Sequence, residues 1–369
     1  MIKKICFFSI GFAFNRLVRL KFYEKIFPKN VKIFLFTTDK YAGKEKQSYQ
    51  YEWDGLKRTK IVQARYNPLT LPFALRRFCK ENKIDRVINI GNFYGGLALI
   101  PATILSKTDY ELNILADVFD EYKARDGFCK KLFSVAKLPL LYPAAWFANR
   151  VMFTGKTNYE RANVFFLAPK SKMRHLAAPV NLDLFKPKDK KKSRKKSKLP
   201  MKKKIIVFVG RVNYEKGSDI LTKLIRSNPG IHFIVIGKAI DKEFINLQKS
   251  KIKNLQYIEK KSSKELVDYY SASDLSFCIN RGGGGIGISS EEALACGVPI
   301  LVSKQFKLKN SDALLQTSLN FKQVNKAVKG FFKVPEKNRK KLSKIARKYV
   351  QENYSDKVWK NKYIEAYLN

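Results

Sequence analysis

Histidine and cysteine, the residues that build most zinc sites and all disulfides, are scarce in this sequence. The 369 residues include only His175 and His232, and the five cysteines show no C-x-x-C spacing. So few histidines nearly exclude a His-based zinc centre. An odd number of cysteines, several of them in apolar segments, predicts buried free thiols in a reducing compartment. We therefore expect neither a metal ion nor a disulfide framework to organise this protein.

Long hydrophobic runs are also missing, since none approaches the roughly 18 apolar residues of a membrane-spanning helix. Residues 1–15 superficially resemble a signal peptide, but their apolar part is short and charge resumes at Arg16. We interpret them as a first buried strand followed by a turn at Gly11. The sequence predicts a cytoplasmic protein, with peripheral attachment to the inner face of a membrane as an open alternative.

Acidic residues are also few in this sequence. There are 31 of them against 74 Lys and Arg, which gives a formal net charge of +43. A charge of this size favours polyanionic partners, either nucleic acid or an anionic membrane surface. The alternative is a lysine-rich composition spread over a solvated surface. The 45% hydrophobic content is sufficient for real cores, and the length suggests two domains.

Strand-like and helix-like segments alternate along both halves of the chain. Such alternation predicts an α/β fold with two parallel sheets covered by helices. The strands are expected at 5–10, 31–37, 60–64, 86–90, 112–115 and 151–154, then at 204–209, 232–236, 255–258, 275–279 and 300–303. The helices are expected at 16–27, 72–82, 218–227, 263–271 and 291–296, with a closing amphipathic helix at 336–352 and another at 356–367.

The segment 186–204 is dominated by Lys and Arg. Like charges at this density repel one another and predict an extended linker or surface loop. The same residues could instead bind phosphates. We place an N-terminal Rossmann-like domain at 1–187, a basic linker at 188–204, a second Rossmann-like domain at 205–345 and a C-terminal helix at 346–369.

The most informative stretch is 281–299, where a glycine-rich loop follows a strand and leads into a helix near Ser289. Glycines let backbone N–H groups approach an anion, and a helix N-terminus favours negative charge. The loop residues predicted to contact phosphate or sugar are Gly283, Gly284, Gly285, Ile286, Gly287, Ile288 and Ser289. Glu292 can accept hydrogen bonds from sugar hydroxyls, although the Ser289–Glu292 spacing also fits a capping box.

A second motif begins at Gly210, which permits a tight turn where a strand ends. Arg211 and Lys216 then flank the carboxyl end of the predicted sheet, where ligands of open α/β sheets bind. Two cations at this place suit a diphosphate. The alternative is two exposed cations in a chain that has many.

Residues 179–187 form a third motif. Asn181 and Asp183 suit a turn, and Phe185 anchors it. We favour a structural crossover over a catalytic role.

Along the chain the three stretches come in the order 179–187, 208–219 and 281–299. Together they resemble the glycosyltransferases of family four, which have the GT-B fold of two Rossmann-like domains facing across a cleft. The resemblance assigns the donor diphosphate to Arg211 and Lys216 and the nucleotide ribose to Glu292. It implies a retaining, metal-independent transfer with no cofactor, because the nucleotide sugar is a co-substrate. The C-terminal segment resembles the family segment that returns to the first domain.

The sequence departs from the family at two positions. Gly284 stands where the family has a glutamate that contacts the donor sugar. The family histidine of the first domain has no counterpart, and Asp117, Asp120 or Glu121 could replace it as the polar partner of the donor sugar. Gly11 is a further substrate-binding candidate in this domain.

Three functions remain in view. The first is a hexosyltransferase-type enzyme that moves a sugar from a UDP- or GDP-linked donor to a glycan or lipid-linked acceptor held by the first domain. The second is a catalytically weak or inactive relative acting as a binding or scaffold protein, motivated by the two departures. The third, a nucleic-acid-binding protein built around the basic segment, is disfavoured because no recognisable nucleic-acid module accompanies the charge.

The basic and aromatic segment 16–27 has two interpretations. It could lie on an anionic membrane, or it could be an ordinary helix packed on the sheet.

Overall fold

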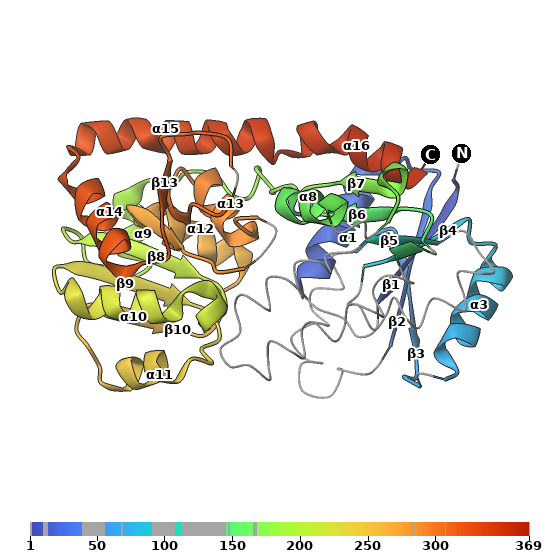
Figure 1. Cartoon of the computed structure of the whole chain (residues 1–369), viewed down its shortest axis with the longest axis horizontal. Coiled ribbons are helices and arrows are strands. Elements are labelled where there is room, and N and C mark those ends of the chain that lie inside the picture. Colours follow the sequence, from blue (N-terminus) through green and yellow to red (C-terminus); the bar gives the residue numbers. More distant parts are fainter. Residues whose placement is uncertain are drawn as a thin grey trace. The chain divides into compact units, whose positions relative to one another are not determined.

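Two parallel sheets organise the chain, one in each of two units. The computed structural model describes residues 2–9, 14–38, 56–67, 69–90, 108–111, 145–146, 148–164, 168–282, 285–306 and 308–368. Unit 1 comprises Met1–Val118, Leu132–Ala178 and Trp359–Asn369, and unit 2 comprises Phe119–Lys131 and Pro179–Val358. Figure 1 shows the elements of each unit.

The sheet of unit 1 has seven strands in the order β3-β2-β1-β4-β5-β6-β7, and all neighbours are parallel. From β1 the chain adds β2 and then β3 on one side of the sheet. It then returns to add β4 and the later strands on the other side of β1, which is the Rossmann pattern. The strands are β1 (Lys4–Ser9), β2 (Lys32–Thr38), β3 (Thr59–Ala64), β4 (Arg86–Asn89), β5 (Thr108–Glu111), β6 (Val151–Phe153) and β7 (Met173–His175). The strand predicted at 112–115 lies outside the described residues, and the others predicted for this half are confirmed.

Helices cover both faces of this sheet. The helices are α1 (Phe14–Ile26), α3 (Leu71–Asn82), α8 (Lys156–Val164), the short 3₁₀ helix η2 (Lys170–Lys172) and α16 (Asp356–Leu368). On one face, the ring of Tyr23 in α1 stacks on Phe7 of β1 at 4.7 Å, and Tyr367 of α16 meets Tyr23 edge-on at 5.5 Å. On the other face, Phe78 of α3 contacts Phe34 of β2 at 5.8 Å. Of the two interpretations of the segment 16–27, the helix packed on the sheet is confirmed, since Tyr23 of α1 is buried against β1.

The sheet of unit 2 has six parallel strands in the order β10-β9-β8-β11-β12-β13. The strands are β8 (Lys204–Val209), β9 (Ile231–Ile236), β10 (Leu255–Ile258), β11 (Leu275–Cys278), β12 (Ile300–Ser303) and β13 (Leu314–Thr317). The five strands predicted for this half are confirmed, and β13 was not predicted.

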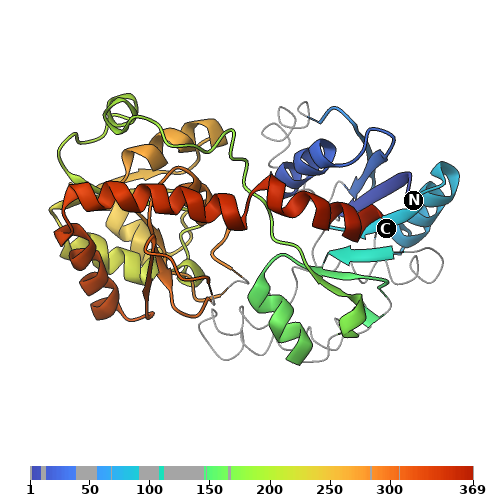
Figure 2. The ribbon, with the colours of Figure 1, turned by 90° about the horizontal axis from the view of Figure 1, so that it is seen from above.

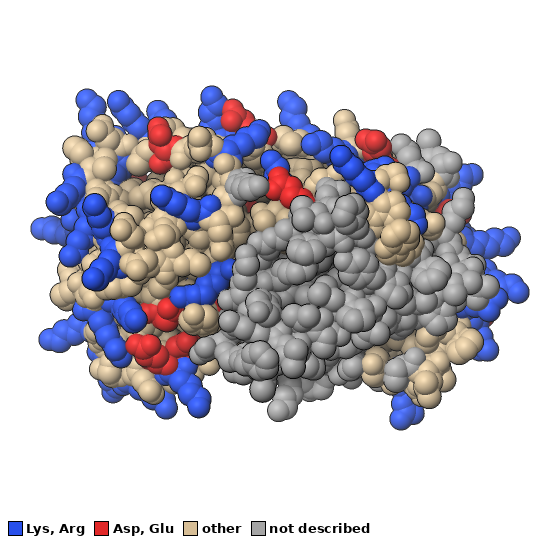
Figure 3. All heavy atoms as spheres, in the orientation of Figure 1, with Lys and Arg blue, Asp and Glu red and all other residues tan. Residues whose placement is uncertain are grey.

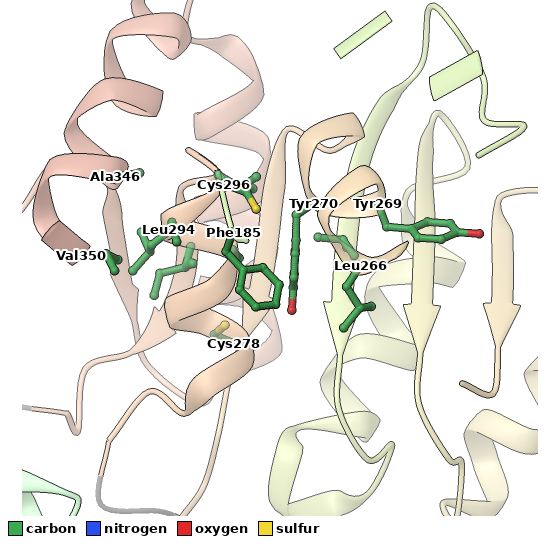
Figure 4. Close-up of a cluster of buried hydrophobic side chains, with 14 of the residues drawn as sticks. Phe185, Leu266, Tyr269, Tyr270, Cys278, Leu294, Cys296, Ala346 and Val350 are labelled. Atoms are coloured by element: carbon green, nitrogen blue, oxygen red, sulfur yellow. The ribbon is translucent and has the colours of Figure 1, made fainter. Parts of the chain in front are cut away.

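Two hydrophobic clusters lie on opposite faces of the second sheet. Helices α10 (Ser218–Ser227), α11 (Lys242–Lys249) and α14 (Phe321–Lys333) contribute to one, and α12 (Ser263–Ala272), α13 (Ile288–Ala295) and α15 (Glu336–Asn353) to the other. Figure 4 shows the second cluster, in which Phe185 stands beside Tyr270. Their ring centroids are 6.3 Å apart in an edge arrangement.

The basic segment is folded, so the prediction of an extended linker at 188–204 is wrong. Asp189 caps a short helix, α9 (Lys190–Lys196), by accepting the N–H of Lys192. Arg194 is buried and donates Nε to the carbonyl of Ala272 at 3.0 Å and Nη2 to Asp274 at 3.1 Å. The carboxylates of Asp268 in α12 and of Asp274, which directly precedes β11, thus neutralise part of the charge that made an extended chain the expectation. The whole segment belongs to unit 2.

The two predicted C-terminal helices are confirmed as α15 and α16. Figure 2 shows α15 lying along unit 2. Arg347 of α15 donates to the carbonyls of Leu182 at 3.0 Å and Ala295 at 2.8 Å. Trp359 and the residues after it belong to unit 1.

The predicted cysteine chemistry is confirmed for the described cysteines. Cys6, Cys79, Cys278 and Cys296 are buried free thiols, and Cys129 lies outside the described residues. Burial raises the pKa of Cys79 to about 12, so this thiol is not a nucleophile at neutral pH.

Candidate functional site

Two glycines shape the place where β8 ends. Gly210 follows β8 with a φ of +149°, and Gly237 follows β9 with a φ of +138°. A Cβ on Gly237 would lie 2.0 Å from the carbonyl oxygen of Gly210, so only glycine permits the two strand ends to approach in this way. The predicted tight turn after β8 is present, and it leads directly to Arg211, whose side chain is exposed.

A single-turn 3₁₀ helix, η3 (Tyr214–Lys216), continues this turn into α10. Asn213 caps it by accepting the N–H of Lys216 at 3.1 Å. Gly217 ends it with a φ of +73°, and a Cβ there would lie 2.4 Å from the carbonyl oxygen of Ile279. The loop after β8 therefore packs directly against the loop after β11, and Lys216 is half-buried at this junction.

Arg281 joins these two loops. Its Nη1 donates to the carbonyl of Tyr214 and to Oδ1 of Asp219, both at 2.7 Å, and its Nη2 donates to Oδ2 of Asp219 at 2.7 Å. Its guanidinium carbon lies 3.9 Å above the centre of the Tyr214 ring, and its own N–H reaches the carbonyl of Glu215. The planar fork of arginine allows all these contacts at once, which a lysine could not reproduce.

Sequence reasoning did not assign a role to Arg281. The signal was available in the pattern, because an arginine directly after a strand stands next to a glycine loop that carries no other charge. Its partner Asp219 lies 62 positions earlier, however, and only the folded chain brings the two together.

The glycine-rich loop continues after Arg281. Gly283 and Gly284 lie outside the described residues, as do Gly11 and Asp117 of the first half. A Cβ built on Gly285 or Gly287 would meet no described atom within 4 Å, and Gly287 has a φ of +83°. No described atom therefore occupies the space beside the loop where the side chains of these two positions would lie.

Side chains from neighbouring strands fix the far end of this loop. Nδ2 of Asn280 donates to the carbonyl of Ile286 at 3.4 Å, and the carbonyl of Asn280 accepts hydrogen bonds from Ser303 and Gln305. Oγ of Ser290 also donates to the carbonyl of Ile286, at 2.8 Å. The loop is therefore held at both ends, by Arg281 and by this network.

Helix α13 begins at Ile288, with Gly287 as its N-cap. The capping box suggested for Ser289 and Glu292 is absent, because no side chain caps this helix. Glu291, not Glu292, is the acidic residue of the first turn, and it is buried. Glu291 raises the pKa of Tyr349 and Tyr354 by its charge, in addition to the larger effect of burial, so it faces α15.

Glu292 accepts a hydrogen bond from the hydroxyl of Tyr270 at 3.2 Å. Tyr270 belongs to α12 and is fully buried. Burial raises the pKa of Glu292 to about 8, and the hydrogen bond from Tyr270 lowers it by less. The carboxyl group is therefore mostly protonated at neutral pH, and it can both donate and accept a hydrogen bond.

Residues 179–187 have the structural role that the sequence favoured. Oδ1 of Asn181 accepts the N–H groups of Asp183 and Leu184, both at 3.1 Å, which makes a tight turn. Phe185 is buried in the cluster beside Tyr270, and its carbonyl is bound by Arg347. Among the described residues, no group of three or more His, Cys, Asp or Glu side chains could hold a metal ion.

The arrangement brings together three of the predicted groups on unit 2. They are the turn with Gly210, Arg211 and Lys216, the loop from Gly285 to Ser289, and Glu292. All follow strands at the carboxyl edge of one parallel sheet, which is where such sheets bind ligands. Cations beside an open glycine loop can neutralise a diphosphate, and a carboxyl group nearby can bind hydroxyls.

A comparison with known families and proteins agrees with this geometry. Residues 189–363 match the family described as glycosyl transferases group 1, so the resemblance stated from the motifs is confirmed for this part of the chain. A D-inositol 3-phosphate glycosyltransferase of Segniliparus rotundus is 27% identical over 151 residues, which are 38% of this chain and 33% of that protein. The corresponding protein of Mycolicibacterium smegmatis is 25% identical over 42% of this chain and 38% of its own length. The match therefore spans little more than a third of these relatives.

Solved structures resemble the whole chain. A sucrose-phosphate synthase from Thermosynechococcus elongatus has a TM-score of 0.80 at 17% identity, covering 99% of this chain and 98% of that one. Anabaena HepE in complex with UDP and glucose has a TM-score of 0.77 at 12% identity, covering 99% of both chains. WaaG, a glycosyltransferase involved in lipopolysaccharide biosynthesis, has a TM-score of 0.71 at 15% identity, covering 99% of both. The GT-B fold class predicted from the sequence is thereby confirmed.

Proposed function

We propose that this chain, whose residues 189–363 match the group 1 glycosyltransferases, transfers a sugar from a UDP- or GDP-linked donor to a glycan or lipid-linked acceptor. The observation that carries the proposal is the junction of the two loops on unit 2, where the turn holding Arg211 and Lys216 is tied to the glycine loop by Arg281. The loops lie at the edge of the sheet where a nucleotide diphosphate binds in α/β folds. HepE, which shares the fold, was crystallised with UDP and glucose, and this favours UDP as the first nucleotide to test.

Arg211 and Lys216 would act on the leaving group. When the bond between the sugar and the diphosphate breaks, negative charge develops on the diphosphate, and fixed cations lower the energy of that state. This role requires no protein nucleophile and no metal ion. We propose that the reaction retains the configuration of the sugar and is independent of metal, as the family resemblance implies.

Glu292 would bind the ribose of the nucleotide. The hydroxyl of Tyr270 and the surrounding apolar side chains fix the position of its carboxyl group. The glycine loop and the start of α13 would offer N–H groups to phosphate or sugar. Asp117 and Gly11 remain proposed contacts for the donor sugar and substrate.

Isothermal titration calorimetry of the full chain with UDP and with GDP tests the donor site. The double variant Arg211→Ala/Lys216→Ala should bind the preferred nucleotide about 100-fold more weakly, because two charge-assisted contacts to phosphate are lost. The matched control is Lys249→Ala/Lys264→Ala, which removes two exposed cations elsewhere on unit 2. Equal affinity of the wild type and the Arg211/Lys216 variant would refute the assignment.

A catalytically weak or inactive binding protein is the second candidate function. Gly284 replaces the glutamate that contacts the donor sugar in the family, and this motivates it. Hydrolysis of UDP-glucose and of other nucleotide sugars by the full chain decides between the two. Saturable nucleotide binding with no turnover of any donor in a broad panel would favour the binding protein.

Unit 1 carries an exposed apolar pair. Leu69 is 80% exposed and Phe73 is 67% exposed, next to the exposed Arg76 and Arg77 of α3. We propose that these residues attach the protein peripherally to an anionic membrane at the cytoplasmic face. No helix in the described part of the chain is long and apolar enough to cross a membrane.

Co-sedimentation with vesicles tests this attachment. Phosphatidylcholine vesicles containing phosphatidylglycerol should retain the protein, and Leu69→Ser/Phe73→Ser should release it. The control Ile240→Ser removes an exposed apolar side chain from unit 2 and should have no effect. Undiminished binding of the Leu69/Phe73 variant would show that net charge alone causes attachment.

A further inference from the structure

A hollow of about 540 Å³ lies in unit 1, at the amino ends of β1, β2 and β3. It is therefore at the opposite end of these strands from their carboxyl ends, where α/β sheets usually bind substrates. Its volume is within the range of small-molecule sites. Among the described residues, those that line it are Lys4, Lys29, Val31, Lys32, Ile33, Phe34, Arg58, Lys60, Glu81 and Asn82.

The strand register places three of these lysines on one face of the sheet. Lys4 of β1 stands opposite Lys32 of β2, and Lys60 of β3 stands opposite Phe34 of β2. Side chains two positions apart on a strand share a face, so Lys32 and Phe34 point the same way. That face is the one covered by α3, since Phe34 contacts Phe78 of α3.

This row of lysines has an energetic cost. Like charges directly opposite one another on paired strands destabilise a sheet. The apolar side chain of Phe34 lines the hollow together with the lysines. Glu81 and Asn82, at the end of α3, line it as well. Glu81 is the one carboxylate among the lining residues.

Two of the five cations are already engaged. Nζ of Lys4 donates to the carbonyl of Asn82 at 2.8 Å. The guanidinium of Arg58 binds backbone carbonyls at the end of α1, including those of Phe27 at 2.9 Å and Pro28 at 2.6 Å. Within the described part of the chain, the side chains of Lys29, Lys32 and Lys60 take part in no hydrogen bond or ion pair, although the backbone N–H of Lys32 donates to the carbonyl of Lys3 at 2.8 Å. Three ammonium groups therefore border the hollow without forming an ion pair with a described carboxylate.

We propose that this hollow is an accessory anion site that takes a ligand with two or more phosphoryl groups. Each free lysine is a compact point charge suited to a phosphate oxygen, and several together match a multiply charged anion better than a single carboxylate. The hollow lies at the amino ends of strands of unit 1, and none of its described lining residues belongs to the donor loops of unit 2, so we propose a ligand other than the donor diphosphate. A soluble diphosphate and clustered phospholipid headgroups offer the same chemistry.

Calorimetry with inorganic pyrophosphate tests the site, and the full chain carrying Arg211→Ala/Lys216→Ala is the background. These substitutions remove the proposed donor cations, so the result does not depend on the proposed function. Pyrophosphate should bind saturably, and Lys32→Gln/Lys60→Gln should weaken binding about tenfold or more. Glu81→Gln should strengthen binding, because it removes the carboxylate that repels the ligand.

Lys249→Gln/Lys264→Gln is the matched control, since it removes the same charge from exposed positions of unit 2. An equal loss of pyrophosphate affinity in the control would show that net charge alone causes the binding. The absence of saturable binding would show that the site does not exist. Thermal unfolding provides a folding check, because Lys32→Gln/Lys60→Gln should not lower the melting temperature when it relieves repulsion.

A vesicle arm separates the two sources of phosphate. Vesicles of phosphatidylcholine with phosphatidylglycerol are compared with pyrophosphate for the same variants. Loss of both signals in Lys32→Gln/Lys60→Gln assigns the site to headgroups as well as soluble anions. Loss of the pyrophosphate signal alone assigns it to a soluble ligand.

Discussion

Arg281 holds two loops together through Tyr214, Glu215 and Asp219, and none of these three residues is proposed to touch the donor. Its side chain is only 10% exposed, and it forms a bidentate pair with Asp219 while lying on the ring of Tyr214. The turn between them contains Lys216. Arg281 is thus a positioning residue, because it determines where the neighbouring cation lies.

We expect Arg281→Ala to weaken UDP binding about tenfold, although it removes no proposed ligand contact. It should also lower the free energy of unfolding by about 2 kcal/mol, through the loss of hydrogen bonds to a charged partner. Arg281→Lys should restore little of the affinity, because lysine lacks the fork. Calorimetry and chemical denaturation, with Asp219→Asn as the second arm of a double-mutant cycle, measure both effects. Additive losses in the cycle would mean that the pair does not act as a unit.

Glu292 gives the protein a predictable pH dependence. Its pKa is raised to about 8 in the folded chain, against roughly 4.3 in an unfolded one. The folded state then binds more protons than the unfolded state between these values, so this group makes stability fall as pH rises from about 5 to 9. Glu292→Gln cannot ionise and should remove this component, so that the variant is more stable than the wild type at pH 9 but not at pH 5. Thermal unfolding across this range measures it, and parallel curves for the two proteins would contradict the prediction.

Among the elements, α9 shows how a basic segment can be part of a core. We expect Arg194→Met to destabilise the protein by about 3–5 kcal/mol, because Asp274 would keep its burial and lose a partner. Lys195→Met, on the exposed side of the same helix, should change stability by less than about 0.5 kcal/mol. Chemical denaturation compares the two. Equal effects would restore the interpretation of 188–204 as a loose linker.

Periodicity predicted most strands of both sheets, since buried parallel strands are continuous apolar runs that end at glycine or polar residues. It failed for α9 because its charges are neutralised by Asp268 and Asp274, which lie about 70 to 80 positions away along the chain. It failed for β13 because this strand, Leu314–Thr317, lies at the sheet edge and is only half apolar. The sequence around a segment does not show which distant residues will pair with it in the folded protein.

The site shows the same division. Gly210 was recognisable from the sequence as the residue of a tight turn, and its φ of +149° agrees with that prediction. The capping box, which was the alternative role for Glu292, is absent, because the helix begins at Ile288 and the carboxyl group instead accepts a hydrogen bond from Tyr270. Tyr270 lies 22 positions before Glu292, so the spacing of residues within the loop could not predict this hydrogen bond.

At the scale of the whole molecule, the charge is dispersed over the surface. Figure 3 shows Lys and Arg side chains spread over both described parts of the visible face, with few Asp and Glu among them. Part of the remaining basic charge is paired inside unit 2, as at Asp268 and Asp274. A lysine-rich composition on a solvated surface therefore explains most of the +43, and the folded basic segment weakens the case for a nucleic-acid-binding arm.

The last residues of the chain complete the core of unit 1, although they follow all of unit 2 in the sequence. Tyr363 donates its hydroxyl to the carbonyls of Leu176 and Ala177, and Arg86 donates to the carbonyl of Tyr367 at 2.9 Å. We expect Tyr367→Ala to cost about 3–5 kcal/mol, because it leaves a cavity beside Tyr23 and Phe7. Removal of residues 359–369 should cost more, because buried Arg86 also loses the carbonyls of Ala366 and Tyr367 as acceptors.

The location of this loss distinguishes a local effect from general unfolding. Hydrogen exchange should accelerate in β1 and β4 of unit 1 and stay unchanged in β8 and β9 of unit 2, since the two units have separate cores. Asn361→Ala, at an exposed position of the same helix, is the matched control and should leave exchange unchanged in both units. Equal acceleration in both sheets would mean that the units unfold as one. Acceleration confined to β1 and β4 would mean that the C-terminal helix stabilises unit 1 specifically, so that unit 1 reaches its full stability only when residues 359–368, which follow unit 2 in the sequence, are packed on it.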